Sequence, residues 1–467
     1  MIDRGAMVTP PKTEAPLVTR RELIAGGAAL LTPGFSFAQG ADTEVADAMW
    51  KMVRGSRRGF DEGMAVIEAL DDVALVPPLI LVQRFSRAPS AWLDAPMQRL
   101  TGEDRAGWYE WMLWQEANAQ VVPPPWYADL KRRMYLQIDP NFEVFLRDEY
   151  LGREAARIRF EEVTWGGVRK DGIPSLDNPR LIAGKEAAYL REEDLVFGVS
   201  INGDARAYPL RIMGWHEMFD EVIGGVPVAL AYCTLCGSGI LFETDVPGRN
   251  APFVFGSSGF LYRSNKLMFD RETHTLWNQF TGEPVIGPLA KSGLQLGQRP
   301  VVIEPWSTWF AKNPDTQVLS LNTGHSRDYG SGVVYREYFG SPDLMFPTLV
   351  DETEMRQKDY VFGIRQFGAA KAWPVSAFMT MRLINDHVGD TPVVLIGDER
   401  GRTVRAYERG SREFAWQDGP VADGRWQVTE DALLGPDGQS LPRVAGHIAY
   451  WFAWSGYLSD VAELWRP

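Results

Sequence analysis

The chain has 467 residues, of which 45% are hydrophobic and 12% aromatic, which is enough apolar material for large cores. Its length indicates two to four domains. Its formal net charge is −13, and its basic residues form no cluster. Both features argue against a nucleic-acid partner, because phosphate binding requires a clustered basic face.

The first forty residues have the features of an export signal. The pair Arg20-Arg21 precedes the apolar stretch Ala25–Leu31, and Ser36-Phe37-Ala38 supplies the small residues of a cleavage site. That stretch is shorter than the roughly 20 residues of a membrane span. We expect a Tat-type signal peptide over residues 1–38, a Tat export partner, a periplasmic location and no membrane span after cleavage. A disordered cytosolic N-terminus is the alternative.

Residues 41–150 are predicted to form a helical domain. Apolar residues recur there at three- and four-residue spacing. One segment, residues 71–82, resembles a helix of a HEAT-like repeat, with prolines near the helix start. The predicted helical segments are Val45–Arg54, Gly63–Leu70, Leu75–Phe85, Arg105–Asn118 and the region Trp126–Asp148.

After residue 158 the sequence changes to short β-branched and aromatic runs separated by Gly, Pro, Asn and Asp, which predicts a sheet-rich domain. Asn202-Gly203 is a plausible hairpin turn, because both residues tolerate positive φ. The predicted strands are Asp194–Ser200, Ala205–Pro209, Val228–Tyr232, Gly239–Phe242, Phe253–Phe255, Leu267–Phe269 and Leu276–Phe280.

An internal repeat divides this β-rich region. Leu195–Gly239 aligns without gaps on Tyr360–Val404 at an offset of 165 residues. The predicted fold class is therefore α+β: an N-terminal helical domain followed by a β-rich domain built from an internal duplication. Its halves span residues 158–324 and 335–465.

The repeat serves as an internal control for the only two cysteines, Cys233 and Cys236. Scaffold glycines and prolines persist in both halves, whereas the set formed by His216, Cys233 and Cys236 occurs only in the first. A residue that the fold itself required would be expected in both copies, so we interpret this difference as functional. At the same offset His216, Glu217, Cys233 and Cys236 become Met381, Arg382, Asp398 and Gly401.

A Cys-x-x-Cys turn followed by glycine has the shape of a metal knuckle. We predict a metal site formed by His216, Cys233 and Cys236, with a carboxylate or an open position as fourth ligand. Three protein ligands and an open position are typical of catalytic zinc, and the same donors suit copper or iron. Glu217 could orient His216 or act as a general base.

Two alternatives for the cysteines stay open. In an exported protein they could form a structural disulfide. They could also perform thiol–disulfide redox chemistry. A thioredoxin-like motif would begin a helix, whereas residues 237–243 are predicted as strand.

The motifs around the cysteines resemble the bacterial DUF3179 family, a domain family named for its unknown function. The resemblance rests on WHEMFDEVIGGVPVALAYCTLCGSGILFE and FGSSGFLYRSNKLMFDRETHTLWNQFTGEPVIGPL and extends from about Ile158 to Trp465. It implies an architecture and a candidate site without an established reaction. Asp270 and Trp277/Gln279 match two family motifs. Asp270 could cap a turn or face the site, and Gln279 could donate to a bound cofactor.

From these features we expect a periplasmic metal-binding protein, which could act as a metal-dependent enzyme on a small molecule. The alternatives are a non-catalytic metal carrier and a thiol–disulfide redox protein using Cys233 and Cys236.

Overall fold

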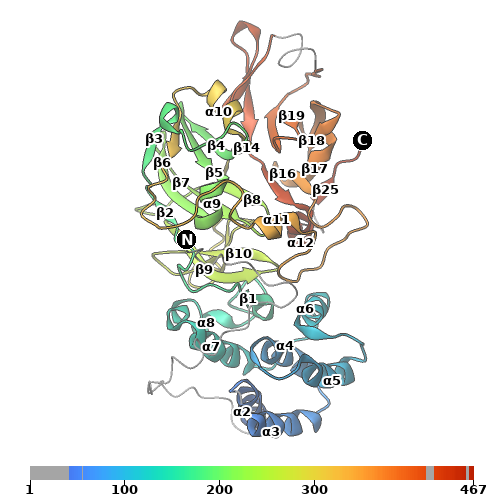
Figure 1. The fold of residues 1–467 in the computed structure, drawn as a ribbon. Coiled ribbons are helices and arrows are strands. Elements are labelled where there is room, and N and C mark those ends of the chain that lie inside the picture. The colour runs from blue at the N-terminus through green and yellow to red at the C-terminus, as the bar shows by residue number, and fades with distance from the viewer. Residues whose placement is uncertain (1–40, 55, 417–424, 459–461) are drawn as a thin grey trace, which may run out of the picture.

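The computed structural model describes residues 41–54, 56–416, 425–458 and 462–467. Helices occupy the N-terminal end, and sheets make up most of the remaining chain (Figure 1). This arrangement confirms the predicted order of a helical region and a β-rich region. The predicted signal peptide lies outside the described residues. None of the described helices is long and apolar enough to cross a membrane.

The helical region forms where the apolar spacing predicted it. One helix, α5, was missed because Pro96 lies inside it, and proline normally disfavours a helix interior. The helices are α2 (Ala41–Val53), α3 (Arg57–Glu68), α4 (Val76–Phe85), α5 (Ser90–Thr101), α6 (Gly107–Ala117), α7 (Tyr127–Ile138) and α8 (Asp148–Leu151).

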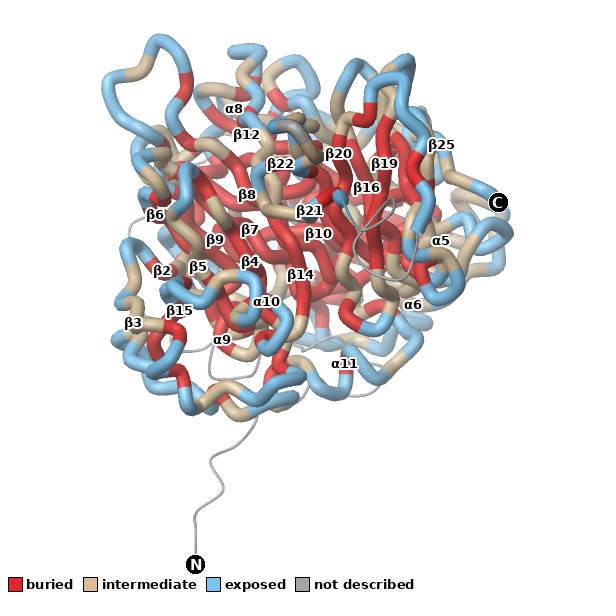
Figure 2. The backbone as a smooth tube through the Cα atoms, turned by 90° about the horizontal axis from the view of Figure 1, so that it is seen from above, coloured by how far each residue is buried: buried red, intermediate tan, exposed pale blue. Residues whose placement is uncertain are grey.

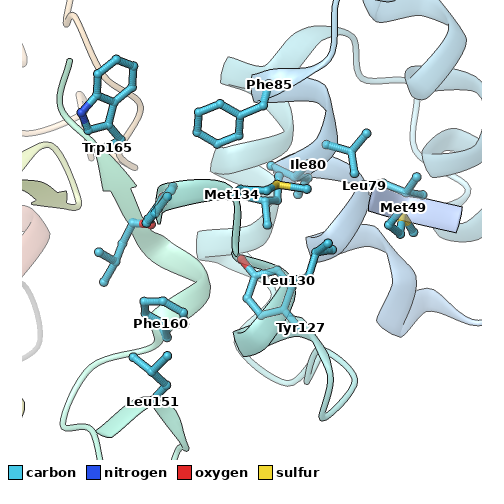
Figure 3. Packing of buried hydrophobic residues seen from close by; sticks show 14 of the residues in the cluster. Met49, Leu79, Ile80, Phe85, Tyr127, Leu130, Met134, Leu151, Phe160 and Trp165 are labelled. Atoms are coloured by element: carbon cyan, nitrogen blue, oxygen red, sulfur yellow. The ribbon is translucent and has the colours of Figure 1, made fainter. Parts of the chain in front are cut away.

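The helical region shares its hydrophobic core with a sheet of the β-rich region. Figure 3 shows part of this core, with Met49, Leu79 and Met134 from the helices. The ring of Phe260, from the sheet, lies 5.2 Å from the ring of Tyr135 and 4.5 Å from that of Phe142. The two regions are therefore held together by buried apolar surface, as well as by the chain between them.

The sheet that contacts the helices has the order β1-β9-β10-β11-β12. We predicted a strand over Phe253–Phe255, whereas β9 begins at Phe255 and continues through FGSSGFLY to Tyr262. Serine and glycine resemble a turn in the sequence, but here they are buried in a central strand. The bounds are β1 (Val163–Trp165), β9 (Phe255–Tyr262), β10 (Asn265–Asp270), β11 (Leu276–Asn278) and β12 (Glu283–Ile286).

Two further pairs of sheets share one plan. In the first half the order of elements is β4 (Leu195–Ile201), β5 (Asp204–Pro209), α9 (Leu210–His216), β6 (Met218–Ile223), β7 (Val226–Cys233), β8 (Ser238–Glu243), β14 (Val302–Pro305), α10 (Trp306–Lys312) and β15 (Gln317–Leu319). In the second half it is β16 (Tyr360–Gln366), β17 (Ala369–Pro374), η5 (Val375–Met379), β18 (Leu383–Val388), β19 (Thr391–Asp398), β20 (Thr403–Glu408), β24 (His447–Tyr450), α12 (Trp451–Leu458) and β25 (Ala462–Leu464).

Strand register recurs between these two sets. Val196 pairs with Pro209 between β4 and β5, and Val361 pairs with Pro374 between β16 and β17. Both residues of the second pair lie 165 positions after the corresponding residues of the first pair. The same offset relates the β6–β7 pairing to β18–β19 and the β7–β8 pairing to β19–β20. The remaining short strands are β2 (Leu176–Asp177), β3 (Leu181–Ala183), β13 (Gln298–Arg299), β21 (Gln427–Val428), β22 (Ala432–Leu434) and β23 (Ser440–Val444).

The two halves contact each other reciprocally. β24 of the second half lies beside β8 of the first, and β14 of the first lies beside β20 of the second. Figure 2 shows the buried strands gathered at the centre of this region. The cysteine turn connects β7 to β8, so it lies at the boundary between the halves, where Tyr450 N donates to Cys236 O at 2.8 Å.

Candidate functional site

The two cysteines lie on a tight turn, as the sequence predicted. Cys233 ends β7 and pairs with Ser238, the first residue of β8. Within the turn, Cys236 N donates to Cys233 O at 3.2 Å. Gly237 has φ +60°, and a Cβ there would lie 3.1 Å from the rings of Tyr360 and Tyr450. Glycine is required here because the backbone is left-handed and two tyrosines pack against it.

The thiols face each other inside the protein. The two Sγ atoms are 2.8 Å apart, and Cys236 Sγ donates to Ser264 O at 3.5 Å. Both cysteines are free, and their exposed fractions are 2% for Cys233 and 0% for Cys236. Burial is the largest cause that raises the pKa of Cys236 well above its ordinary value, so this thiol stays protonated at neutral pH.

Glu217 lies beside this turn in an unusual backbone conformation. It ends α9 with φ +56°, a left-handed value that a non-glycine residue adopts at a cost. This conformation is fixed by Glu217 N donating to Met213 O at 2.7 Å and by Tyr232 N donating to Glu217 O at 2.8 Å. The side chain is buried as a result, against the same turn that holds the cysteines.

The carboxylate of Glu217 is enclosed by donors. Thr234 Oγ1, from within the cysteine turn, donates to Oε1 at 2.8 Å, and Tyr335 OH reaches the same oxygen at 3.4 Å. Lys266 Nζ lies 3.3 Å from Oε2. Both Glu217 and Lys266 are buried, so the two charges are removed from water as a pair.

The structure does not gather His216 with the cysteines. Its ring is buried, with Nδ1 2.9 Å from Pro174 O and Nε2 2.6 Å from Tyr329 OH. A carbonyl only accepts, so Nδ1 carries the proton and Nε2 accepts from the tyrosine. Burial lowers the pKa of His216 to about 4, which keeps the ring neutral.

These contacts differ from those of the expected ligand set. Both ring nitrogens of His216 are used by protein partners, so neither is free to join the sulfurs in a Cys2His site. Among the described residues, no group of three or more His, Cys, Asp or Glu side chains is placed to hold a metal ion. The thiols lie on the turn that the motif predicts, whereas the ring of His216 bonds to Pro174 and Tyr329.

Asp270 is occupied by its own turn. Its Oδ1 accepts from Thr273 N at 2.6 Å, and its Oδ2 accepts from Thr273 Oγ1 at 2.7 Å and from Trp277 Nε1 at 3.0 Å. These bonds give Asp270 the turn-capping role that the sequence favoured. Because both carboxylate oxygens of Asp270 are used in these bonds, nothing among the described residues supports the predicted contact between Asp270 and a cofactor.

Gln279 lies closer to the thiols. Its Nε2 donates to Ala231 O on β7 at 2.7 Å and to Ser238 O at 3.4 Å, while Oε1 has no partner among the described residues. The same holds for other buried polar atoms near the turn. They are Ser238 Oγ, Ser264 Oγ and both amide atoms of Asn265. Buried polar groups are normally hydrogen-bonded to protein, water or an ion, so these atoms have unused hydrogen-bonding capacity beside the turn.

Sequence reasoning missed Lys266 and the tyrosines that close the site. Lys266 is the single charged side chain inside the buried run NKLMF of β10, and a lysine in such a run was the available signal. Tyr335 and Tyr338 belong to α11 (Arg336–Gly340) and its preceding residue, in the connection between the halves. Tyr338 OH donates to Leu235 O of the cysteine turn at 2.6 Å.

Comparison with known proteins places this arrangement in a family. The family described as "Protein of unknown function (DUF3179)" matches residues 170–461. The chain belongs to DUF3179. The match includes the strands of both halves as far as β24, and it excludes β1, β25 and the helices α2 to α8. No curated protein and no solved structure matches the chain.

The second half of this DUF3179 chain shows what the same corner of the fold contains without cysteines. At the offset of 165, Glu217 and Cys233 correspond to Arg382 and Asp398. These two form an ion pair of 3.0 Å whose side chains are 50% and 44% exposed. Thus the corner that is charged and open to water in one half is buried and sulfur-containing in the other.

Proposed function

We propose that Cys233 and Cys236 form a thiol–disulfide redox pair and that DUF3179 proteins with this turn carry out two-electron chemistry there. The observation that carries this proposal is the Sγ–Sγ distance of 2.8 Å. Two sulfurs bound tetrahedrally to one zinc ion at about 2.3 Å would lie about 3.8 Å apart. The observed Sγ–Sγ distance is therefore shorter than two sulfur ligands of one zinc ion would have, and it favours formation of an S–S bond.

The redox step balances within a small set of groups. Each thiol loses a proton and one electron as the Cys233–Cys236 bond forms, and the two electrons reduce the S–S bond of a small disulfide compound to two thiols. The two protons pass to the thiols so formed. Glu217, bonded to Thr234 of the same turn, is the base that we assign to remove a thiol proton, with Lys266 balancing its charge.

A second candidate is a soft metal ion held by the same two sulfurs, in a carrier or an enzyme acting on a small molecule. The buried polar atoms of Ser238, Ser264, Asn265 and Gln279 that have no partner among the described residues favour it, because a bound polar or charged group could use their hydrogen-bonding capacity. Without His216 the site would offer two thiolates, a set that suits monovalent copper better than zinc or iron.

One preparation distinguishes the two candidates. The protein is purified without reductant, its metal content is measured, and its thiols are titrated in denaturant after equilibration in thiol–disulfide buffers of graded potential. If the cysteines are a redox pair, the protein should contain no stoichiometric metal. The number of thiols titrated per chain should then change reversibly between two and zero as the buffer potential changes. A metal site predicts stoichiometric metal and thiols that resist oxidation until a chelator is added. Thiols that never oxidise reversibly in the metal-free protein would refute the redox proposal.

The Cys233→Ser variant adds a direct control. It should keep the wild-type fold, because serine is smaller than cysteine and the bond from Cys236 N to Cys233 O within the turn joins backbone atoms, yet it should lose the reversible step. The residues of the second half corresponding to Cys233 and Cys236 are Asp398 and Gly401, which is consistent with a fold that does not depend on the sulfurs.

We also infer that the two halves arose by duplication and that the chain is exported. The recurring offset of 165 in sequence and register supports the duplication. Aligning the two halves across many DUF3179 sequences should give similarity above chance, and similarity at chance level would contradict it. The twin-arginine segment supports Tat export, which cell fractionation with and without an Arg20→Lys/Arg21→Lys change would test.

A further inference from the structure

The connection between the two halves covers the cysteine turn. It extends over residues 320–359, from the end of β15 to the start of β16, and contains one short helix, α11. Connections longer than about 12–15 residues without much secondary structure are uncommon in compact domains, and many of them are functional lids. Figure 1 shows α11 close to α9 and α12.

The contacts of α11 reach the site directly. Tyr338 OH donates to Leu235 O between the two cysteines, and Tyr335 OH donates to Glu217 Oε1. Val334 packs on α9, where a Cβ on Gly214 would lie 2.5 Å from Val334 Cγ1. The cover therefore closes over the thiols and over the carboxylate that we assign as their base.

The same cover is weakly built. A helix of five residues is far below the length at which helices are stable in isolation, about 12–15 residues. Tyr335 precedes it with φ +52°, and Arg336, Glu337, Phe339 and Gly340 are each exposed or only partly buried. Within α11 itself only Tyr338 is buried. Lys358 holds it from the far end of the connection, donating to Tyr338 O and Ser341 O.

The corresponding corner of the second half is open. Arg382 and Asp398 are about half exposed there, so the described residues leave that corner in contact with water. The cover thus occurs at the corner that contains the sulfurs. The second half shows that the fold itself does not require this corner to be covered.

We propose that α11 with its flanking residues Val334 and Tyr335 is a gate, and that it must lift before a small reactant can reach Cys233 and Cys236. Closed, it keeps the thiols protonated and out of reach. Open, it exposes the turn and frees Glu217 from Tyr335. This inference rests on the proposed thiol chemistry, and it names how that chemistry is regulated.

The test is the rate at which the native, reduced protein reacts with N-ethylmaleimide. The chain has only two cysteines, so every labelled thiol reports on this site. For a gate, the wild type should react far more slowly than the denatured chain, at a rate set by local opening. The Tyr338→Phe variant removes one hydrogen bond of the gate and should react about threefold to tenfold faster.

Tyr407→Phe is the matched control. Tyr407 is buried and donates to a backbone carbonyl, Thr429 O, at the same 2.6 Å, but in the second half. It should leave the labelling rate unchanged. Equal acceleration by both variants would mean that global unfolding exposes the thiols, and it would overturn the gate, as would wild-type labelling as fast as in denaturant.

Hydrogen exchange of the wild type gives a reading that depends on no variant. Amides of residues 334–340 should exchange faster than those of β7, and equal protection of the two segments would refute local opening. Failure of the redox proposal is recognised separately, because the redox titration measures an equilibrium, which a gate does not alter, whereas the labelling measures a rate.

Discussion

Lys266 Nζ lies 3.3 Å from Glu217 Oε2, and both residues are buried beside the cysteine turn. The lysine comes from β10, in the sheet that packs on the helices, and the glutamate from the end of α9. The pair therefore joins the cysteine half of the β-rich region to the sheet that carries the helical region. Its charges are removed from water together, so each depends on the other.

Removing only the lysine should be costly. Lys266→Met leaves the Glu217 carboxylate buried without its counter-charge, and we expect the free energy of unfolding to fall by about 3–5 kcal/mol. Urea denaturation measures it. The double variant Lys266→Met/Glu217→Gln should recover most of this loss, since the remaining amide is neutral. A double variant as unstable as the single one would show that the lost packing of Lys266, rather than its charge, sets the cost.

The buried pair between the halves should behave differently from an exposed one. Arg405 Nη2 donates to Glu304 Oε1 at 2.5 Å, and both residues are buried where β14 meets β20. Arg405→Met should lower the free energy of unfolding by about 3–5 kcal/mol, because it also leaves Glu430 without this partner. Arg382→Met is the control, since its pair with Asp398 is about half exposed and is worth about 0–1 kcal/mol. Equal effects in denaturant titrations would contradict the expectation that breaking the buried pair costs more than breaking the exposed one.

Acid should destabilise the protein partly through His216. Burial lowers its folded-state pKa to about 4 from an ordinary value of 6.5. The folded protein thus binds fewer protons than the unfolded chain between these values. The contribution of the neutral His216 ring to the free energy of unfolding is fully present above pH 6.5. It is lost as the pH falls towards 4, and the total loss is about 2–3 kcal/mol. His216→Met, which installs the residue of the second half, should flatten the change in unfolding free energy between about pH 7 and about pH 4.5; parallel curves for variant and wild type would exclude this contribution.

Alkali should stabilise the protein through Lys131. This lysine is buried between the helices and donates to Phe160 O and Glu161 O, and burial lowers its pKa to about 7. The unfolded chain, with an ordinary value of 10.5, binds more protons between about pH 7 and about pH 10. Unfolding free energy should therefore rise with pH over this range, with about 1–3 kcal/mol more gain in the wild type than in Lys131→Met. A variant that gains as much as the wild type would show that other groups cause the rise.

Much of the fold could be predicted because its signals are local. The spacing of apolar residues located α4 and α6, and a run such as VPVALAYC located β7. Asn202 and Gly203 both adopt positive φ, as their residue types predicted for a hairpin turn. Where a local signal misleads, the prediction failed: the serines and glycines of β9 resemble a turn, and burial under the helices makes them a strand.

The sequence by itself determined that a glycine-closed turn would hold both sulfurs and that its counterpart at an offset of 165 would lack them. Only the tertiary structure decided what surrounds that turn. Lys266 is 49 residues from Glu217 in sequence and Tyr335 is 118 residues from it, and no short-range pattern relates such distant positions. His216 shows the same limit in reverse, because it is near the turn in sequence while its ring nitrogens bond to Pro174 and Tyr329. The backbone conformation of a turn depends on its own residues, whereas the partners of its side chains depend on which distant segments fold against it.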